Sequence, residues 1–292
     1  MKALAFALCL AGSLLAGCTT QQVDDDEPSI QANPPHVNPL QLVLPLDAYR
    51  PTAIQQITLT RARNALIKAC MKRFGFDYPV VTPNAASLSS GNARRYLLAD
   101  PVSAAQRGYH PPQALIDASK AAQSGPTLSP AALSVVSGKG QSSYNGQAVP
   151  EGGCNGEASR RLVKGLPATP PNLSIVDELS GDSYNRSLQH TRLRAGFASW
   201  SECMKKSGYS YRTPHDANND RVFATEIPSP QEIATAVADV SCKEETNLVG
   251  IWAAVDQAYQ SRSIVKNELK LNEVKQSMNV SLRNAADVLA AG

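Results

Sequence analysis

The sequence lacks the patterns that mark several large classes of protein. Its 28 Lys and Arg side chains nearly balance its 25 Asp and Glu side chains, and a net charge of +3 gives no reason to expect a nucleic-acid partner. It has no H-E-x-x-H and no G-x-S-x-G, which are typical of zinc peptidases and serine hydrolases. No glycine pattern follows a strand as a phosphate-binding loop requires. We therefore predict no nucleic-acid partner and no cofactor.

Closely spaced cysteine pairs are also missing. A four-cysteine metal site usually contains C-x2-C, whereas the nearest neighbours among Cys70, Cys154, Cys203 and Cys242 are 39 residues apart. An even number of cysteines is typical of disulfides in an oxidising compartment. The spacing favours two disulfides and predicts no metal site, with a four-cysteine metal site as the alternative.

Only one long apolar run is present, and it lies at the N-terminus. Residues 3–16 are almost wholly apolar and follow Lys2, as in a signal peptide, and the run is too short to span a bilayer. Residues 15–18 read Leu-Ala-Gly-Cys, which resembles the lipobox at which bacteria attach diacylglycerol to a cysteine and cleave before it. We expect residues 1–17 to be a signal peptide and Cys18 to carry lipid, such as palmitate. An ordinary secretory signal is the alternative.

The next segment differs from the rest of the chain in composition. Residues 18–45 are polar, acidic and proline-bearing, which predicts a disordered tether between the lipid and the folded domain. Residues 46–292 are then expected to form a single helical domain. This layout places the protein at the cell membrane, on its extracytoplasmic face, with the membrane contacted through the lipid at Cys18.

The domain contains an internal repeat. Residues 70–78 and 203–211 share the pattern C-M-K-[KR]-x-G-[FY]-x-Y, and residues 154–157 and 242–245 share C-x-x-E. Apolar spacing predicts a helix before each C-M-K, and the glycine suits the left-handed position that ends a helix. We expect a short extended segment next, and then C-x-x-E in the first turn of another helix, where a glutamate is favourable. The repeat predicts two related helical units, about 46–163 and 183–250.

The repeat also favours one pattern of disulfides. The economical pairing joins the cysteines within each copy, Cys70–Cys154 and Cys203–Cys242, so that each bond connects the end of one helix to the start of the next. Crossed pairing between the copies is the alternative.

The regions between the repeated motifs are rich in loop-forming residues. Residues 80–153 contain many Gly, Ser, Pro and Asn residues, and we expect short helices near 101–107 and 112–123 within long loops. Residues 164–182 are expected to form a proline-rich connection. The fold class is therefore mainly α, with short extended segments, long loops and two disulfides.

A long C-terminal helix, about 230–290, completes the predicted fold. Ser229 and Pro230, followed by Glu232, are typical of a helix start. No proline follows, and apolar residues recur in a heptad-like stripe from Leu248 to Leu289. The helix either packs against the body or projects to meet a protein partner. We expect its first part to be buried at Trp252, Val255 and Tyr259, and a chain that ends near Lys270 to stay folded and lose the partner.

The candidates for chemistry are few. The histidines have no ligand spacing; they are His36, His110, His190 and His215. The segment Tyr109-His110-Pro111-Pro112 is a stiff aromatic turn, and we predict a ligand surface that comprises Tyr109, His110 and Tyr144. Glu157 and Glu245 match across the repeat, either as an acid–base pair or as helix-start residues, and we favour the second. The catalytic residues, if any, are unknown.

The whole layout resembles the uncharacterised secreted lipoproteins of actinobacteria. The resemblance covers most of the chain and consists of the lipobox, the acidic tether, the repeated C-M-K motif, the segment V-P-E-G-G-C at residues 149–154 and the long C-terminal helix. That group has no established activity, so the resemblance implies fold and location only.

We predict a non-enzymatic binding or interaction protein of the cell envelope, with an extracytoplasmic cell-wall or peptide hydrolase as the alternative. A pocket with a His–carboxylate pair would favour the hydrolase. A broad exposed apolar strip on the last helix would favour the partner. The solute-binding component of an importer usually needs alternating strands and helices, which the sequence does not suggest.

Overall fold

A computed structural model describes residues 27–80, 91–124, 127–167 and 171–291, and its described part is mainly α-helical, as predicted. The predicted signal peptide and the predicted lipidation site, Cys18, lie outside the described residues. The helices are η1 (Pro39–Gln41), η2 (Pro45–Tyr49), α1 (Ala53–Arg73), α2 (Pro101–Arg107), α3 (Gln113–Ser124), α4 (Pro130–Ser137), α5 (Gly153–Leu162), α6 (Ile175–Ser187), α7 (Thr191–Lys206), α8 (Pro214–Asn218), η4 (Arg221–Phe223), α9 (Pro230–Glu245), α10 (Leu248–Lys266) and α11 (Glu268–Ala290). One small antiparallel hairpin is described, in which β1 (Ser143–Tyr144) pairs with β2 (Gln147–Ala148).

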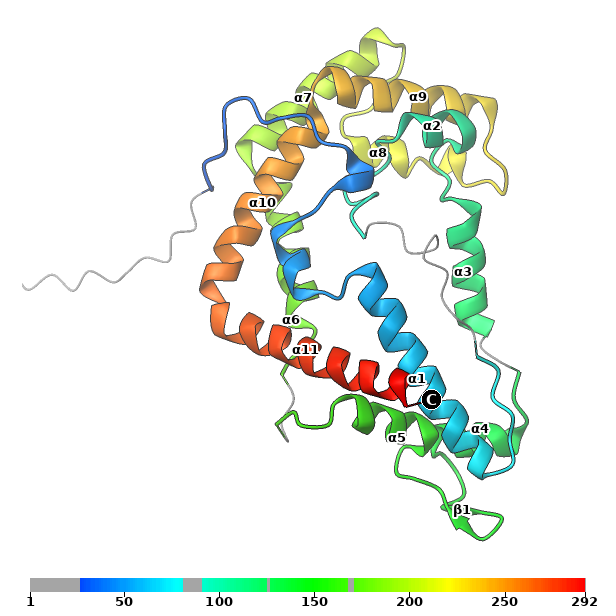
Figure 1. Cartoon of the computed structure of the whole chain (residues 1–292). Helices are drawn as coiled ribbons and strands as arrows, with labels where there is room; N and C mark the ends of the chain where they lie inside the picture. The colour runs from blue at the N-terminus through cyan, green and yellow to red at the C-terminus, as the bar shows by residue number, and fades with distance from the viewer. Residues whose placement is uncertain (1–26, 81–90, 125–126, 168–170, 292) are drawn as a thin grey trace, which may run out of the picture.

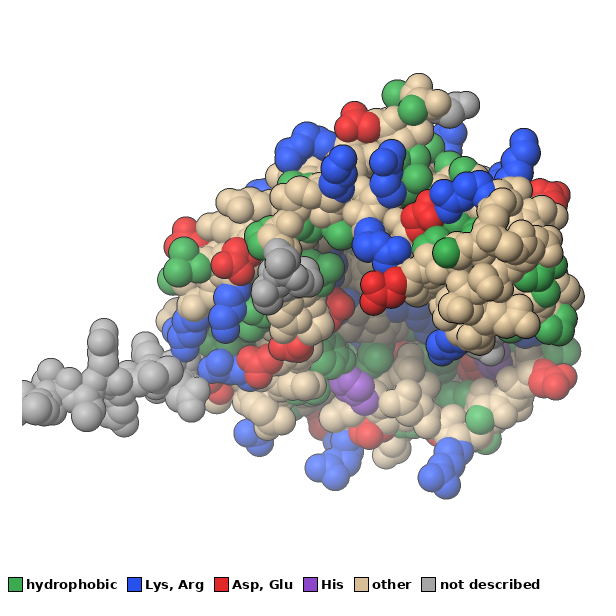
Figure 2. All heavy atoms as spheres, turned by 90° about the horizontal axis from the view of Figure 1, so that it is seen from below, with side chains coloured by type: hydrophobic (Ala, Val, Ile, Leu, Met, Phe, Trp, Pro, Cys, Tyr) green, Lys and Arg blue, Asp and Glu red, His purple; other side chains and the backbone are tan. Residues whose placement is uncertain are grey.

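Two clusters of helices occupy opposite ends of the molecule (Figure 1). One cluster contains α1, α4 and α5, and the other contains α2, α7, α8 and α9. Along one edge α6 and α10 pack against each other and connect the two ends. Seen from below, the surface is hollowed near its centre, and basic and acidic side chains are mixed around the hollow (Figure 2). That face therefore carries no extended patch of one charge.

Both predicted disulfides are present, one in each helical cluster. Cys70 is bonded to Cys154 in the first and Cys203 to Cys242 in the second. All four cysteines are buried with apolar neighbours of their own cluster. The pairing within repeats is therefore confirmed in the structure.

The repeated glycine ends its helix in the same way in both units. Gly75 and Gly208 have positive φ angles of 79° and 88°. After each helix, the glycine N–H bonds to the carbonyl two residues before the helix cap, and the next N–H bonds to the carbonyl of a buried methionine, Met71 or Met204. This is the hydrogen-bond pattern of a Schellman motif. The local sequence pattern thus determines where both helices stop.

The second half of the repeat is not equivalent in the two units. Cys154 lies in the first turn of α5, as predicted, but Cys242 lies in the last turn of α9. The prediction was wrong for Cys242 because α9 begins at Pro230, where Ser229 accepts a hydrogen bond from the third helical N–H. The Ser229 cap defines the start of α9. The disulfide with Cys203 does not require Cys242 to lie at a helix start.

The predicted C-terminal rod is three helices rather than one. It breaks at Asn247, whose φ is positive, and again at Asn267, which separates α10 from α11. Trp252, Val255 and Tyr259 of α10 are buried, as predicted.

The last helix, α11, folds back onto the body, where it packs against α1 and α5 (Figure 1). Ala285 is buried there, and Leu271 and Val274 are buried against η2 and α6. The distal stripe therefore contributes to the core, which argues against the expectation that a chain ending near Lys270 keeps its fold.

Two connecting segments are more ordered than predicted. The proline-rich connection at 164–182 gives way to α6 at Ile175. The second half of the predicted tether, residues 27–45, lies on the domain: the Pro28 carbonyl accepts a hydrogen bond from His190 at 3.0 Å, and the Pro34 carbonyl accepts one from a side-chain amide at 2.7 Å. The prediction of a disordered tether was therefore wrong for residues 27–45, which contact the folded domain.

Candidate functional site

The three residues of the predicted ligand surface do not come together. Tyr144 lies in the hairpin of the first unit, where its ring packs against Phe76 with 4.9 Å between the ring centroids. Tyr109 and His110 follow α2, in the cluster that also contains α7, α8 and α9. Figure 1 shows β1 and α2 at opposite ends of the molecule. The site is therefore described around Tyr109 and His110 alone.

A buried glutamate holds the turn that contains Tyr109 and His110. The side chain of Glu232, in the first turn of α9, is 0% exposed. Its Oε1 accepts a hydrogen bond from the Tyr109 backbone N–H and one from His110 Nδ1, each at 2.8 Å. The Arg94 guanidinium donates to the carbonyls of both turn residues, at 2.8 and 3.3 Å. The turn is thus fixed to α9 from one side and by an arginine from the other.

Gly108 makes this close approach possible. Its φ is +55°, and a Cβ at this position would lie 2.5 Å from Glu232 Oε1. A side chain would therefore collide with the carboxylate, and a positive φ already favours glycine. The glycine directs the chain from α2 straight into contact with α9.

His110 uses both ring nitrogens. Nδ1 contacts the Glu232 carboxylate at 2.8 Å and Nε2 contacts the Thr225 carbonyl at 2.7 Å. Both partners are acceptors, so both nitrogens must donate, which requires the imidazolium form. The Thr225 carbonyl, followed by Glu232, accordingly raises the pKa of His110. In this arrangement the histidine has no lone pair with which to accept a proton from a substrate.

A polar pocket of about 300 Å³ opens beside this turn. Its lining residues come from the turn, the α8–η4 region and the start of α9: Tyr109, His110, Pro111, Asn218, Asn219, Asp220, Arg221, Phe223, Ala224, Thr225 and Glu232. Three lining residues have a buried oxygen without a hydrogen-bond partner in the described part of the chain: Glu232 at Oε2, Asn218 at Oδ1 and Tyr109 at its hydroxyl. The pocket therefore combines a fixed wall with two unsatisfied oxygens that can only accept and one hydroxyl that can also donate.

A buried ion pair lies behind the pocket. Lys243 Nζ donates to Asp239 Oδ2 at 2.9 Å and to the Leu98 carbonyl at 2.6 Å, while Trp200 Nε1 donates to Asp239 Oδ1 at 2.9 Å. Burial lowers the pKa of Lys243 and raises that of Asp239, and their mutual attraction opposes both changes. Because every charged atom has a partner, the pair holds α9 against its neighbours and presents no free group to the pocket.

The other histidines have structural contacts. His190 caps the start of α7 and bonds to the N-terminal segment. His36 lies 3.2 Å from the exposed Glu244 carboxylate. His215 bonds to the Tyr184 hydroxyl at 2.9 Å, and burial lowers the pKa of His215.

The matched glutamates are not a catalytic pair. Glu157 forms an ion pair with Arg73 in the first unit, whereas Glu245 is exposed at the end of α9 in the second. The two carboxylates therefore belong to different ends of the molecule.

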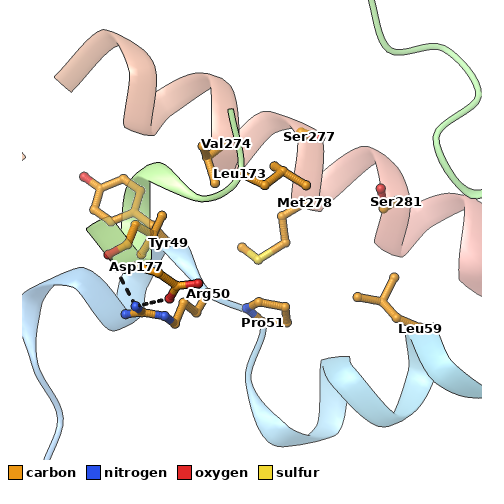
Figure 3. A pocket seen from close by; sticks show the side chains of 11 residues that line it. Tyr49, Arg50, Pro51, Leu59, Leu173, Asp177, Val274, Ser277, Met278 and Ser281 are labelled. Atoms are coloured by element: carbon orange, nitrogen blue, oxygen red, sulfur yellow. Dashed lines mark hydrogen bonds and ion pairs between the residues drawn. The ribbon is translucent and has the colours of Figure 1, made fainter. Parts of the chain in front are cut away.

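A second pocket, of about 340 Å³, is mostly apolar and lies between η2, α1, α6 and α11 (Figure 3). Met278 of α11 projects toward Pro51 between the helices, and an ion pair between Arg50 and Asp177 lies at one end. Its lining residues are Tyr49, Arg50, Pro51, Leu59, Leu173, Val176, Asp177, Val274, Ser277, Met278 and Ser281. Among the described residues that line this second pocket, none has a buried polar atom without a hydrogen-bond partner.

The carboxylate of Glu232 was not recognised from the sequence. Ser229 and a glutamate three residues later are typical of a helix N-cap, and this signal correctly located the start of α9. It also concealed the role of the side chain, which reaches the turn 122 residues earlier in the chain. The signal that was available is the rigid Gly-Tyr-His-Pro-Pro turn.

Within the described residues, no group of His, Cys, Asp and Glu side chains has an arrangement suited to a metal ion. None of the described helices has both the length and the apolar character needed to cross a bilayer. No family model, curated protein sequence or solved structure matches this chain.

Proposed function

We propose that this chain is a lipid-anchored protein of the bacterial envelope that binds a ligand without transforming it. The location is supported by the lipobox at residues 15–18, and the two disulfides are consistent with an oxidising compartment. The ligand site is the polar pocket beside Tyr109 and His110.

The observation that carries binding over catalysis is the hydrogen bonding of His110. A His–carboxylate pair beside a pocket is the arrangement that would favour a hydrolase. Here Nε2, the nitrogen that would serve a substrate, donates to the Thr225 carbonyl. A general base needs a free lone pair within reach of the proton that it removes. His110 therefore positions Glu232 and the turn.

A hydrolase is the second candidate function, because one oxygen of the Glu232 carboxylate is without a partner. Glu232 Oε2 is buried and has no partner among the described residues, as a carboxylate that acts on a substrate would be. Incubation of the protein with purified peptidoglycan, followed by mass spectrometry of the soluble products, distinguishes the two. Products that Glu232→Gln abolishes would establish the hydrolase, whereas the binding protein releases none.

The anchor is tested by labelling cells with radioactive palmitate and separating membrane from soluble fractions. We expect label on the wild-type protein and none on the Cys18→Ser variant. Without the lipid, the variant should move from the membrane fraction to the soluble fraction. Cys9→Ser is the matched control, because this cysteine lies inside the apolar run and outside the lipobox. An unlabelled wild-type protein would contradict the proposed anchor.

A further inference from the structure

The polar pocket beside Glu232 differs from the other pockets in having buried acceptors that nothing in the described chain satisfies. We propose that it binds a small molecule through a primary ammonium group, which donates hydrogen bonds to Glu232 Oε2 and Asn218 Oδ1. This inference rests on the proposed function and adds the chemical class of the ligand.

The two oxygens of Glu232 have different surroundings. Oε1 accepts two hydrogen bonds, from the Tyr109 N–H and from the His110 ring. Oε2 accepts none, although the side chain is fully buried. A buried acceptor without a partner has lost its hydration and has gained no hydrogen bond in return. A donor bound in the pocket would supply that hydrogen bond, which makes Glu232 Oε2 a recognition point.

Asn218 provides the second acceptor. Its Nδ2 donates to Asn219 Oδ1 at 3.0 Å, which orients the amide and leaves Oδ1 without a donor. The third unsatisfied oxygen of the lining residues, the Tyr109 hydroxyl, can donate as well as accept. A ligand that satisfies Glu232 Oε2 and Asn218 Oδ1 must bring donors, which an anion or a carbonyl group lacks.

An ammonium group fits this requirement better than a hydroxyl group. It offers three donors and no acceptor, and its positive charge strengthens a hydrogen bond to a carboxylate. The formal charges of the lining residues balance, with His110 and Arg221 opposite Asp220 and Glu232. The selection therefore depends on the unsatisfied acceptors rather than on a net negative field.

The rest of the pocket suits the carbon skeleton of a small amine. The ring of Tyr109 is stacked on that of Phe223, with 5.7 Å between the centroids, and Pro111 adds a third apolar wall. A volume of about 300 Å³ is at the small end of the range for ligand pockets. A metabolite-sized amine is therefore a better fit than a polymer.

The experiment is isothermal titration calorimetry of the lipidated chain in detergent with three matched pairs of probes. The pairs are glucosamine and glucose, ethanolamine and ethylene glycol, and butylamine and butanol. The first member of each pair has a primary ammonium group in place of a hydroxyl group of the second. We expect at least one amine to bind at least tenfold more tightly than its matched compound.

Variants connect this binding to the pocket. Glu232→Gln should weaken the amine at least tenfold, and Asn218→Asp, which adds a second carboxylate of the same shape, should tighten it. Glu268→Gln, at the exposed start of α11, is the control and should change nothing. Circular dichroism checks that each variant is folded. If the Glu232→Gln variant does not fold, Asn218→Asp still tests the proposal.

Three results would overturn the proposal: no binding by any amine, equal binding within every pair, or amine binding that Asn218→Asp leaves unchanged. The first would mean that water alone satisfies the two oxygens. None of them affects the palmitate result, so a failure of the ligand class can be told apart from a failure of the anchored function.

Discussion

Leu271→Ala should destabilise the protein far more than Leu269→Ala, although the two leucines are two residues apart on α11. Leu271 is 0% exposed and packs with Leu46 and Ile175, whereas Leu269 is 81% exposed. A buried Leu→Ala change costs about 2–5 kcal/mol through lost burial and the cavity that it leaves. An exposed change usually costs within about 0.5 kcal/mol. The cost expected for Leu271→Ala is a large part of a typical free energy of unfolding of about 5–15 kcal/mol.

The assay is urea denaturation followed by circular dichroism at fixed pH, with the disulfides oxidised. At a slope of about 2 kcal/mol per molar urea, Leu271→Ala should lower the midpoint by about 1–2.5 M, and Leu269→Ala should leave it nearly unchanged. Equal midpoints would show that α11 does not contribute to the core. The projecting helix and its protein partner would then become the better interpretation again.

Three further predictions concern His110, the Cys203–Cys242 disulfide and two glycines. The hydrogen bonds that raise the pKa of His110 add stability that is complete below the unfolded-state pKa of about 6.5 and is lost as pH rises through the higher folded value. His110→Gln should therefore remove a fall in the urea midpoint above neutral pH, and an unchanged fall would disprove the assignment. Replacing Cys203 and Cys242 together by Ala should cost about 4 kcal/mol for a 39-residue loop, and a cost below 1 kcal/mol in the same assay would contradict the entropic account. Gly208→Ala, at φ 88°, should cost about 1–2 kcal/mol, whereas Gly181→Ala inside α6, with no atom near the added Cβ, should gain up to about 1 kcal/mol; melting curves of the two variants that shift in the same direction would refute this contrast.

Local signals in the sequence were enough for much of the helical framework. The glycine after each C-M-K helix needs a positive φ whatever surrounds it, so the stop is encoded within a few residues. The two short helices expected near 101–107 and 112–123 occur as α2 and α3. Each disulfide was predictable because the repeat supplied a reason to pair cysteines within a copy.

The path of the chain after α10 could not be read in the same way. A heptad-like stripe reports that one face of a helix is apolar, and it does not report what covers that face. Here η2 and α6 cover the first part of the stripe and α1 and α5 cover the last part, because Asn267 turns α11 back over the body. The partner that the sequence suggested for this stripe is, at Leu271, Val274 and Ala285, the protein's own core.

The candidate site shows why sequence patterns reached only half of it. The turn at Tyr109 and His110 was visible because its rigidity is local. Glu232 was assigned to a helix cap, which a glutamate three residues after a serine usually explains. In the structure Ser229 caps α9 by accepting a hydrogen bond from the backbone N–H of Glu232, and the Glu232 side chain takes no part in the cap. The carboxylate instead binds the distant turn through Oε1. Its other oxygen, Oε2, has no partner among the described residues and belongs to a residue that lines the pocket. The feature that argues for a ligand therefore arises from a contact between distant segments, and a motif search would need the fold to find it.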